Sequence, residues 1–504
     1  MTKSVDILII GSGISALFFA IKTAIKCPNK SILILTKSSK DNNSTRYAQG
    51  GIAIVTDFIK DDFTNHIEDT LRAGKYTNKL EVVEMVIKQA PERLEELIRF
   101  NIDFDKNPDG TWNLGLEGGH SQHRILHHKD ISGLEIERKL LQKLKDFPNI
   151  SLNENTAVLN LTQNNKNCIG VFYYDRKSKT TDFIFSNVTV LCTGGCGQVF
   201  KRTTNPEIAT GDGLAMAHKI GAEIQDMHNI QFHPTALYEK NKNQYFLISE
   251  AVRGFGAYII NQKGERFVFK HDVRGELATR DIVSEAIETE MKKNGTEFVY
   301  LDCRHLDENE FNNHFPTIVA YCNNIGLSPK TDLIPIFPVA HYQCGGIVVD
   351  KNSQTTVPRL FAIGECSYTG LHGNNRLASN SLLEALVYAH QCSEYLVDNN
   401  EIFTSPKIEN HPLPSFQIST NNNNLQATEI RQKLQKIITQ GFLNQLPLDF
   451  AKERITEIYE ETKLLASSNI KNLETVELEN MTIVATLIID AKIQYSKLTS
   501  TNFP

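Results

Sequence analysis

The sequence predicts an α/β fold in three parts: a Rossmann-like domain, an α+β segment inserted into it, and a C-terminal helical bundle. A glycine-rich turn joins a short apolar run to a helical stretch at the chain start, and another apolar run ends in glycine at residues 360–365. Beyond residue 425 the chain is nearly free of glycine and proline and has helical periodicity. At 504 residues it exceeds what one hydrophobic core usually supports, so two or three domains are expected.

The N-terminal residues have the pattern of a βαβ unit that binds a dinucleotide. Residues 5–10 are a short apolar run typical of a buried parallel strand, followed by Gly11-Ser12-Gly13-Ile14-Ser15-Ala16. A helical stretch at 17–26 and a second strand at 31–35 complete the unit. The glycines let the backbone approach a pyrophosphate, and the helix N-terminus supplies free N–H groups. The acid that would bind a ribose after the second strand is replaced by Thr36-Lys37, which argues against plain NAD binding.

The rest of the chain alternates between helical and strand-like patterns. Helical stretches at 80–100, broken at Pro91, and at 132–145 precede strand-like runs at 156–161 and 169–174. A strand at 188–192 ends in a glycine-rich turn, and Gly211-Asp212-Gly213 opens another helix. We therefore predict the first part of the dinucleotide domain at 1–227, the insertion at 228–342, the second part at 343–410 and the helical bundle at 415–504.

Composition excludes several classes of function. The net charge of −6 and pI of about 6.2 give no overall attraction for nucleic acid. The nine cysteines are scattered and odd in number, which predicts reduced thiols in a cytoplasmic protein. The first apolar run is too short for a signal peptide, and no stretch approaches the ~18 apolar residues of a membrane span. We expect no nucleic acid and no membrane among the partners.

Five separated segments carry a resemblance to a known family. Residues 44–53, 231–235, 250–254, 279–281 and 372–382 resemble the flavoprotein family of the succinate dehydrogenases and fumarate reductases. Within it, residues 116–121 and 338–342 most resemble the L-aspartate oxidases. The resemblance runs in order from residue 5 to about residue 387, and it implies an FAD-binding domain split by an α+β capping domain.

The resemblance implies FAD as the cofactor, and Lys37 is the residue that the family shows after the second strand. In the membrane-associated respiratory relatives, a histidine five residues before the glutamine of Gln-Gly-Gly bonds covalently to the flavin. Ser44 stands at that position here, so the FAD should be non-covalent. The FAD contacts implied by motif are Ser12, Gly13, Ile14, Ser15, Lys37, Ser44, Thr45, Arg46, Tyr47, Ala48, Gln49, Gly50, Gly51, Asp212, Glu365, Ser381 and Leu382.

L-Aspartate carries two carboxylates and one ammonium, so its pocket needs two cationic clamps and one acceptor. The resemblance places Arg376 and His341, with His233, on the carboxylates, where a guanidinium gives bidentate recognition. Arg280 matches the arginine that moves a proton in relatives, and it would be coupled through Glu250 and Arg253. Other side chains implied to line this pocket are Thr235, Ser249 and Glu250.

Glu117 is the acceptor in this interpretation, because it lies where dicarboxylate dehydrogenases carry a phenylalanine. A carboxylate can accept charge-assisted hydrogen bonds from an α-ammonium, whereas an apolar ring suits succinate. The implied reaction is hydride transfer from Cα to flavin N5, which gives iminoaspartate and begins NAD biosynthesis through quinolinate. Dioxygen or fumarate would reoxidise the flavin, and iminoaspartate would be handed to quinolinate synthase.

Other interpretations stay open at this point. A soluble fumarate reductase or succinate dehydrogenase-like flavoprotein shares most of the motifs, although Ser44 and Glu117 speak against the respiratory subunit. A non-catalytic flavin sensor on the same fold is the other alternative. The histidines at 120, 123 and 127 have helical spacing, but without a partner at ligand spacing we predict packing and no metal. Residues 495–500 depart from the Glu-Ser-Arg-Gly-x-His segment that usually ends the helical domain in relatives.

Overall fold

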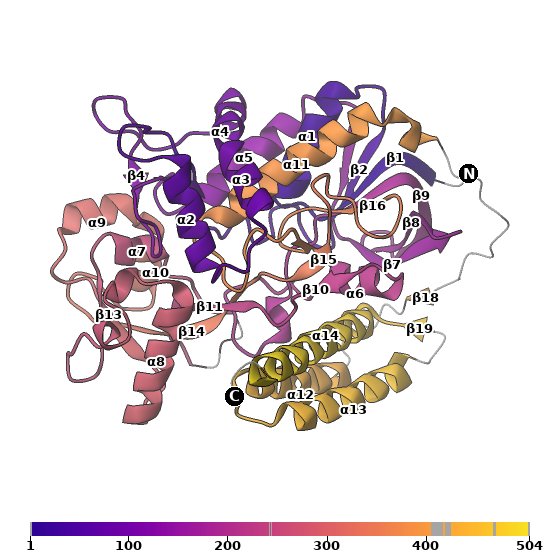
Figure 1. The fold of residues 1–504 in the computed structure, drawn as a ribbon. Helices are drawn as coiled ribbons and strands as arrows, with labels where there is room; N and C mark the ends of the chain where they lie inside the picture. Colours follow the sequence, from indigo (N-terminus) through magenta and orange to yellow (C-terminus); the bar gives the residue numbers. More distant parts are fainter. Residues whose placement is uncertain are drawn as a thin grey trace.

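A computed structural model gives the fold and describes residues 3–240, 242, 244–404, 417–418, 425–466 and 470–501. Figure 1 shows three regions: a large α/β region, a smaller α+β region to its left and a helical bundle below. This arrangement confirms the predicted fold class. Its chain order, with the smaller region inserted between two segments of the larger one, also follows the prediction.

A seven-stranded sheet organises the large region. Its order is β6-β2-β1-β9-β8-β7, and β16 pairs in parallel with β9. Strands β6, β2, β1 and β9 are parallel, whereas β9, β8 and β7 form an antiparallel meander. The strands are β1 (Lys3–Ile10), β2 (Ile32–Leu35), β6 (Ile150–Asn153), β7 (Thr156–Asn164), β8 (Asn167–Asp175), β9 (Thr180–Leu191) and β16 (Leu360–Ala362).

The antiparallel meander extends further than the sequence indicated. Strand β9 begins at Thr180, whereas the apolar pattern predicted a strand only from residue 188. Strands β7 and β8 are joined by Asn165 and Lys166, both with positive φ (47° and 66°), as a two-residue hairpin with primed turn geometry requires. The polar residues at the start of β9 hid its length, because a half-exposed antiparallel strand lacks a continuous apolar run.

Helices cover the sheet and bury its apolar faces. Helix α1 (Ile14–Lys26) is buried on almost every side and packs beside α11 (Asn380–Asp398), as Figure 1 shows. The predicted helical stretch at 80–100 is two helices, α3 (Leu80–Lys88) and α4 (Ala90–Arg99), and Pro91 lies in the first turn of α4. Further helices here are α2 (Phe63–Ala73), α5 (Ser132–Leu144) and α6 (Asp212–Lys219).

The large region also contains two small three-stranded sheets. One contains β3 (Ile52–Ala53), β5 (Ile125–Leu126) and β4 (Leu114–Gly115), and the loop from β4 to β5 carries residues 116–124. The other contains β10 (Ile224–Gln225), β15 (Gly346–Val348) and β17 (Ser367–Tyr368).

The inserted region has its own hydrophobic core, which runs in sequence from Leu237 to Ile336. Its sheet has the order β11-β14-β13-β12, with neighbouring strands antiparallel. We refer to this region as the cap. Its elements are β11 (Ile230–Leu237), α7 (Glu250–Gly254), β12 (Tyr258–Ile260), α8 (Arg280–Asn294), β13 (Val299–Asp302), α9 (Glu308–His314), α10 (Pro316–Asn324) and β14 (Ile334–Gln343).

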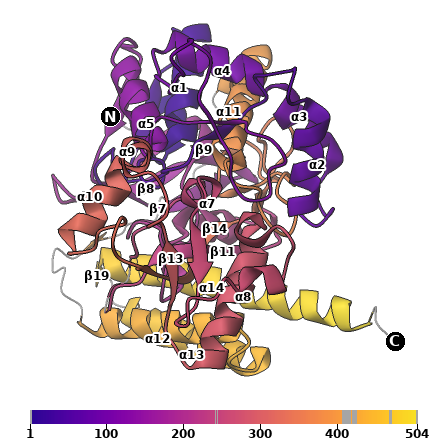
Figure 2. The same cartoon turned by 90° about the vertical axis from the view of Figure 1, so that its left-hand side faces the viewer.

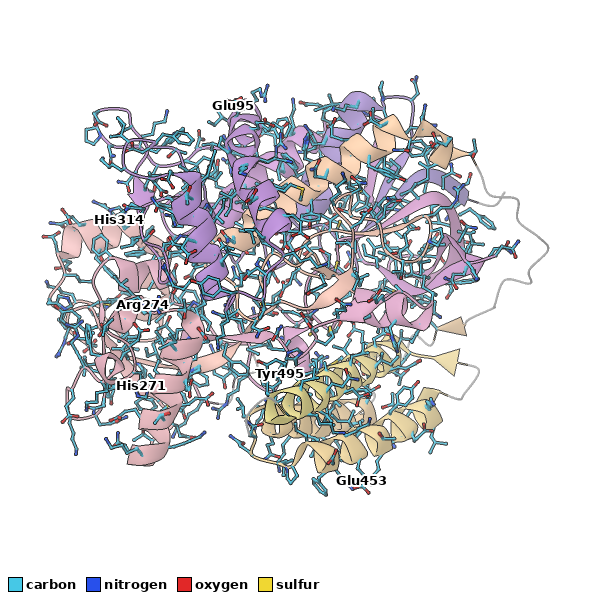
Figure 3. All side chains as sticks on the ribbon, in the orientation of Figure 1. Glu95, His271, Arg274, His314, Glu453 and Tyr495 are labelled. Carbon is cyan, nitrogen blue, oxygen red and sulfur yellow. The ribbon has the colours of Figure 1, made fainter. Side chains whose placement is uncertain are left out.

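The C-terminal bundle consists of α12 (Leu425–Phe442), α13 (Leu448–Ala466) and α14 (Leu473–Thr501). Its buried residues, among them Ile438, Val484 and Ile489, belong to the same hydrophobic core as the large sheet. Figure 2 shows the bundle below the large region, with the cap helix α8 extending down in front of it. The divergent segment lies in α14, where the Tyr495 ring (labelled in Figure 3) stacks on His228 at a centroid distance of 4.4 Å.

No helix in the part of the chain that the structure describes is both long and apolar enough to cross a membrane.

Candidate active site

A cavity of about 710 Å³ lies between the large region and the cap. Its wall contains every side chain or backbone segment predicted for the FAD contacts, from the turn after β1 to the start of α11. It also contains all but one of the residues predicted to bind substrate: Glu117, His233, Ser249, Glu250, Arg280, His341 and Arg376. The fold therefore brings together residues that are more than 300 positions apart in the sequence, such as Ser12 and Arg376.

The part of the cavity wall that we call the cofactor end contains the N-termini of α1 and α6. The N-cap residues of these helices, Gly13 and Gly211, have no side chain that could cap the first turn, and in α1 the backbone N–H of Ile14 donates to Thr45 Oγ1 (3.0 Å). The backbone N–H groups and dipoles of these helices are therefore suited to an anionic group such as a pyrophosphate. Gly11 allows the turn before α1, because its φ is +113° and an added Cβ would lie 2.0 Å from the carbonyl oxygen of Cys192.

Charged side chains of both signs complete the cofactor end. Lys37 Nζ lies 2.7 Å from Asp212 Oδ2, and both residues line the cavity. Glu365 Oε1 accepts a hydrogen bond from the backbone N–H of Gln343 (3.1 Å), and burial raises the pKa of this carboxyl to about 7. Carboxyl groups and a lysine are suitable partners for the hydroxyl and phosphate groups of a dinucleotide.

A second part of the cavity wall, which we call the substrate end, contains an ion-pair network around Glu250. Glu250 Oε2 accepts from Arg280 Nε at 2.5 Å, and Glu250 Oε1 accepts from an Arg253 Nη at 2.6 Å. Arg280 also donates to Gln231 Oε1 (2.9 Å). Burial alone would raise the pKa of Glu250, but the two arginines outweigh it and hold the pKa below its usual value. Glu250 is therefore ionised and orients Arg280.

Arg376 supplies a second guanidinium at the substrate end. Burial, and then the nearby Arg280, lower its pKa to about 10, so the group stays protonated at neutral pH. Its guanidinium lies 4.2 Å from the Tyr342 ring centroid and donates to Ser381 Oγ at 3.0 Å. Its buried Nε has no hydrogen-bond partner among the described residues. A buried donor without a partner is suited to an incoming carboxylate.

The two histidines of the substrate end are neutral. Burial and the nearby Arg280 lower the pKa of His233 and of His341 well below the usual histidine value. The backbone N–H of Thr235 donates to His233 Nδ1 (3.2 Å), so the proton of this ring is on Nε2. Desolvation and the nearby Arg280 and Arg376 favour the uncharged form of His341, so its predicted contact with a substrate carboxylate would be a neutral hydrogen bond and no ion pair.

Thr235 was predicted to line the pocket, but it is not among the residues that line the cavity. Its side chain is buried, and its hydroxyl donates to the carbonyl oxygen of Ile248 (2.8 Å). Its backbone N–H donates to His233 Nδ1 and so fixes the tautomer of that histidine.

Glu117 reaches the substrate end from the loop between β4 and β5. Its side chain is 2% exposed, and its Oε2 accepts from Ser379 Oγ at 2.5 Å. Gly50 allows this position, since an added Cβ there would lie 2.6 Å from Glu117 Oε1. Burial, and then the nearby Glu250, raise the pKa of Glu117 above its usual value. An incoming ammonium would relieve that shift, because a positive charge favours the ionised carboxylate.

Comparison with known proteins places the chain in a family. The FAD binding domain family matches residues 6–382. The L-aspartate oxidase of Yersinia pestis is 37% identical over 502 residues, which cover 96% of this chain and 92% of that protein. The chain belongs to the L-aspartate oxidase family.

Other relatives of the family agree with this result. The chloroplastic L-aspartate oxidase of Oryza sativa subsp. japonica is 41% identical over 410 residues, covering 79% of this chain and 63% of that protein. Thus the match spans less than two thirds of the rice protein. Among solved structures, E. coli quinol fumarate reductase FrdA has a TM-score of 0.86 at 27% identity, covering 97% of this chain and 89% of that chain. The expected resemblance, fold class and FAD-binding domain are confirmed.

His120, His123 and His127 are not grouped as metal ligands in the part of the chain that the structure describes. No group of three or more potential ligands occurs among the residues the structure describes, and residues 116–128 are not helical. His120 Nδ1 lies 2.9 Å from an Nη of the buried Arg124, and its Nε2 lies 3.0 Å from the carbonyl oxygen of Ala378. Burial and Arg124 lower the pKa of His120 to about 4. His120 therefore packs the Glu117 loop against the segment that leads into α11.

Ser379 lines the cavity but was not predicted from the sequence. It precedes α11 and has a left-handed backbone conformation (φ +61°). Its hydroxyl is the group that holds Glu117. The only sequence indication was its position inside the family segment 372–382, because the contact between residues 117 and 379 is tertiary.

Proposed function

We propose that this chain oxidises L-aspartate to iminoaspartate, with non-covalently bound FAD as the hydride acceptor. The observation that carries the proposal is the buried Glu117 carboxylate in the same cavity as Arg280 and Arg376. Two guanidiniums and one carboxylate complement a substrate that has two carboxylates and one ammonium. Relatives that align over nearly the whole chain are named L-aspartate oxidases, which supports the same substrate.

The cavity residues would bind and orient the substrate. We propose that Arg376 and Arg280 bind carboxylates, with His233 donating a neutral hydrogen bond from Nε2. Glu117 would accept hydrogen bonds from the α-ammonium. When bound, FAD supplies the acceptor for the hydride that leaves Cα, and the amine loses a proton as the imine forms. Glu250 keeps Arg280 oriented through their ion pair.

Reduction of the flavin under anaerobic conditions tests the substrate. We expect L-aspartate to bleach the visible flavin absorbance of the purified holoprotein, and succinate to leave it unchanged. Without the ammonium, Glu117 would be a buried acceptor with an unpaired charge, at a cost of several kcal/mol. Bleaching by succinate alone would contradict the proposal and would favour a succinate dehydrogenase-like flavoprotein. No bleaching by either compound would favour a sensor.

The non-covalent state of FAD rests on Ser44, whose hydroxyl lies at the position of the linking histidine in respiratory relatives. We expect acid precipitation to release all the flavin into the supernatant as intact FAD. As a control, the succinate dehydrogenase flavoprotein subunit should keep its flavin in the pellet. Flavin fluorescence on the denatured band of this chain after electrophoresis would contradict the prediction.

The remaining parts of the proposal concern the setting of the reaction. We propose dioxygen or fumarate as the acceptor that reoxidises the flavin, and delivery of iminoaspartate to quinolinate synthase in NAD biosynthesis. The nine unpaired cysteines support a cytoplasmic location. The separate cap core supports domain boundaries near residues 228 and 342.

A further inference from the structure

Two side chains of the C-terminal helix α14 contact residues that line the cofactor end of the cavity. Glu477 Oε1 lies 3.1 Å from Lys37 Nζ, and Asn480 Nδ2 donates to Asp212 Oδ1 at 3.0 Å. Lys37 and Asp212 themselves line the cavity. The matched FAD-binding family ends at residue 382, so α14 lies outside the segment to which FAD binding is assigned.

We propose that α14 is part of the cofactor site, with Glu477 and Asn480 as positioning residues for Lys37 and Asp212. Lys37 follows β2, and Asp212 begins α6, so α14 bridges two separate elements of the cavity through side chains of one helix turn. Held in place before FAD arrives, they lose less conformational freedom on binding. The C-terminal bundle would then contribute to FAD affinity, although none of its described residues lines the cavity.

The electrostatics of this cluster favour a fixed arrangement. Burial alone would lower the pKa of Lys37, but Asp212 and Glu477 raise it above its usual value. Burial alone would raise the pKa of Asp212, but Lys37 outweighs it and the pKa lies below its usual value. Thr210 Oγ1 also accepts from Lys37 Nζ at 2.7 Å. Lys37 and Asp212 are therefore both charged at neutral pH and hold each other in place.

The Asn480 amide can adopt only one orientation in this network. Lys219 Nζ donates to Asn480 Oδ1 at 3.1 Å, so the amide nitrogen must face Asp212. Asn480 is 1% exposed, so both contacts are shielded from bulk solvent. One turn further along α14, Val484 packs against Gly211, where an added Cβ would lie 2.9 Å from Val484 Cγ2. These contacts fix α14 to the start of α6.

Titration of the apoprotein with FAD, followed by flavin fluorescence, tests the proposal. Asn480→Ala changes no charge, and we expect it to weaken FAD binding about tenfold, as the removal of one buried charge-assisted hydrogen bond suggests. Glu477→Ala should also weaken it. Simple Coulomb attraction predicts the opposite for Glu477→Ala, because removing an acid should favour an anionic ligand. Unchanged or tighter FAD binding in both variants would overturn the proposal.

Controls separate positioning from loss of folding. Glu477→Asp keeps the charge and should recover part of the affinity, whereas Glu460→Gln on the exposed face of α13 should have no effect. The far-ultraviolet circular dichroism of the apoproteins should be equal to the wild type, and FAD should still bind more weakly at a temperature well below the melting transition of every variant. Loss of affinity that only follows loss of apoprotein stability would overturn the positioning role. The FAD titration does not depend on the proposed substrate. If the substrate proposal also holds, L-aspartate should still bleach the flavin of both variants once FAD is saturating.

Discussion

Replacing Glu117 by glutamine is expected to lower kcat/KM for L-aspartate by about a hundredfold to a thousandfold, while fumarate reduction changes by less than about threefold. The glutamine keeps the size of the side chain but cannot offer a charged acceptor to the ammonium. Its NH2 group is itself a donor and cannot accept a hydrogen bond from the ammonium. Removing a charge-assisted hydrogen bond from a buried site costs about 3 to 4 kcal/mol, and each tenfold in rate corresponds to about 1.4 kcal/mol. Fumarate has no ammonium, so it makes no use of this acceptor.

The pH dependence of kcat/KM, compared between the wild type and Glu117→Gln, is a second test of the role of Glu117. Because burial and Glu250 raise the pKa of Glu117, the free protein loses the ionised carboxylate at a higher pH than an ordinary glutamate would. We therefore expect kcat/KM for L-aspartate to fall as the pH decreases through that raised pKa. Glu117→Gln should lack this acidic limb, since glutamine does not titrate. The decrease should also be absent from fumarate reduction by the wild type.

Comparing aspartate oxidation with fumarate reduction shows whether Glu117 binds the substrate ammonium or has only a structural role. Glu68→Gln is a matched control, because Glu68 is exposed on α2 and accepts from Tyr76 away from the cavity (2.6 Å). It should leave both activities unchanged. If Glu117→Gln reduced aspartate oxidation and fumarate reduction equally, Glu117 would be a structural residue and the substrate proposal would lose its main support.

The N-terminal βαβ unit could be predicted from the sequence because its causes are local. Gly11 is needed where β1 and β9 end side by side, and the helix that follows is apolar on nearly all sides because the sheet, α5 and α11 enclose it. Such features leave a pattern within about thirty residues. The insertion of the cap could also be predicted, since strand and glycine return at residues 360–365.

Other features depend on contacts between distant residues and left no local pattern. The neutral state of His233 and His341 results from burial beside arginines of other elements, which a sequence does not show. Likewise, the pairing of Lys37 with Glu477 joins positions 440 residues apart. Thr235 was assigned to the pocket by its motif, yet β11 has a register shift between His233 and Ala236, and the Thr235 hydroxyl donates to the carbonyl oxygen of Ile248. Motifs thus identified which residues meet, while the structure gave their charge and orientation.

Replacing Arg376 by lysine is expected to lower kcat/KM by about a hundredfold or more for both L-aspartate oxidation and fumarate reduction. Lysine keeps the positive charge but cannot form the planar, two-pronged contact with a carboxylate. It would also lack the stacking on the Tyr342 ring and the bond to Ser381. Burial would lower the pKa of a lysine at this position further than that of arginine, which weakens even its point charge.

L-Aspartate and fumarate both carry the carboxylate that Arg376 would bind, whereas only L-aspartate carries the ammonium that Glu117 would bind. The two variants should therefore differ in which activities they lose. Arg304→Lys is the matched control, because Arg304 is 46% exposed in the cap and pairs with Asp302 (2.9 Å). Steady-state rates with L-aspartate and with fumarate plus a reduced dye give the two values of kcat/KM. Equal losses for Arg376→Lys, beside selective loss for Glu117→Gln, are what a common carboxylate clamp and a separate ammonium acceptor require. A loss confined to one substrate in Arg376→Lys would contradict that division, because a clamp that both dicarboxylates need cannot distinguish them.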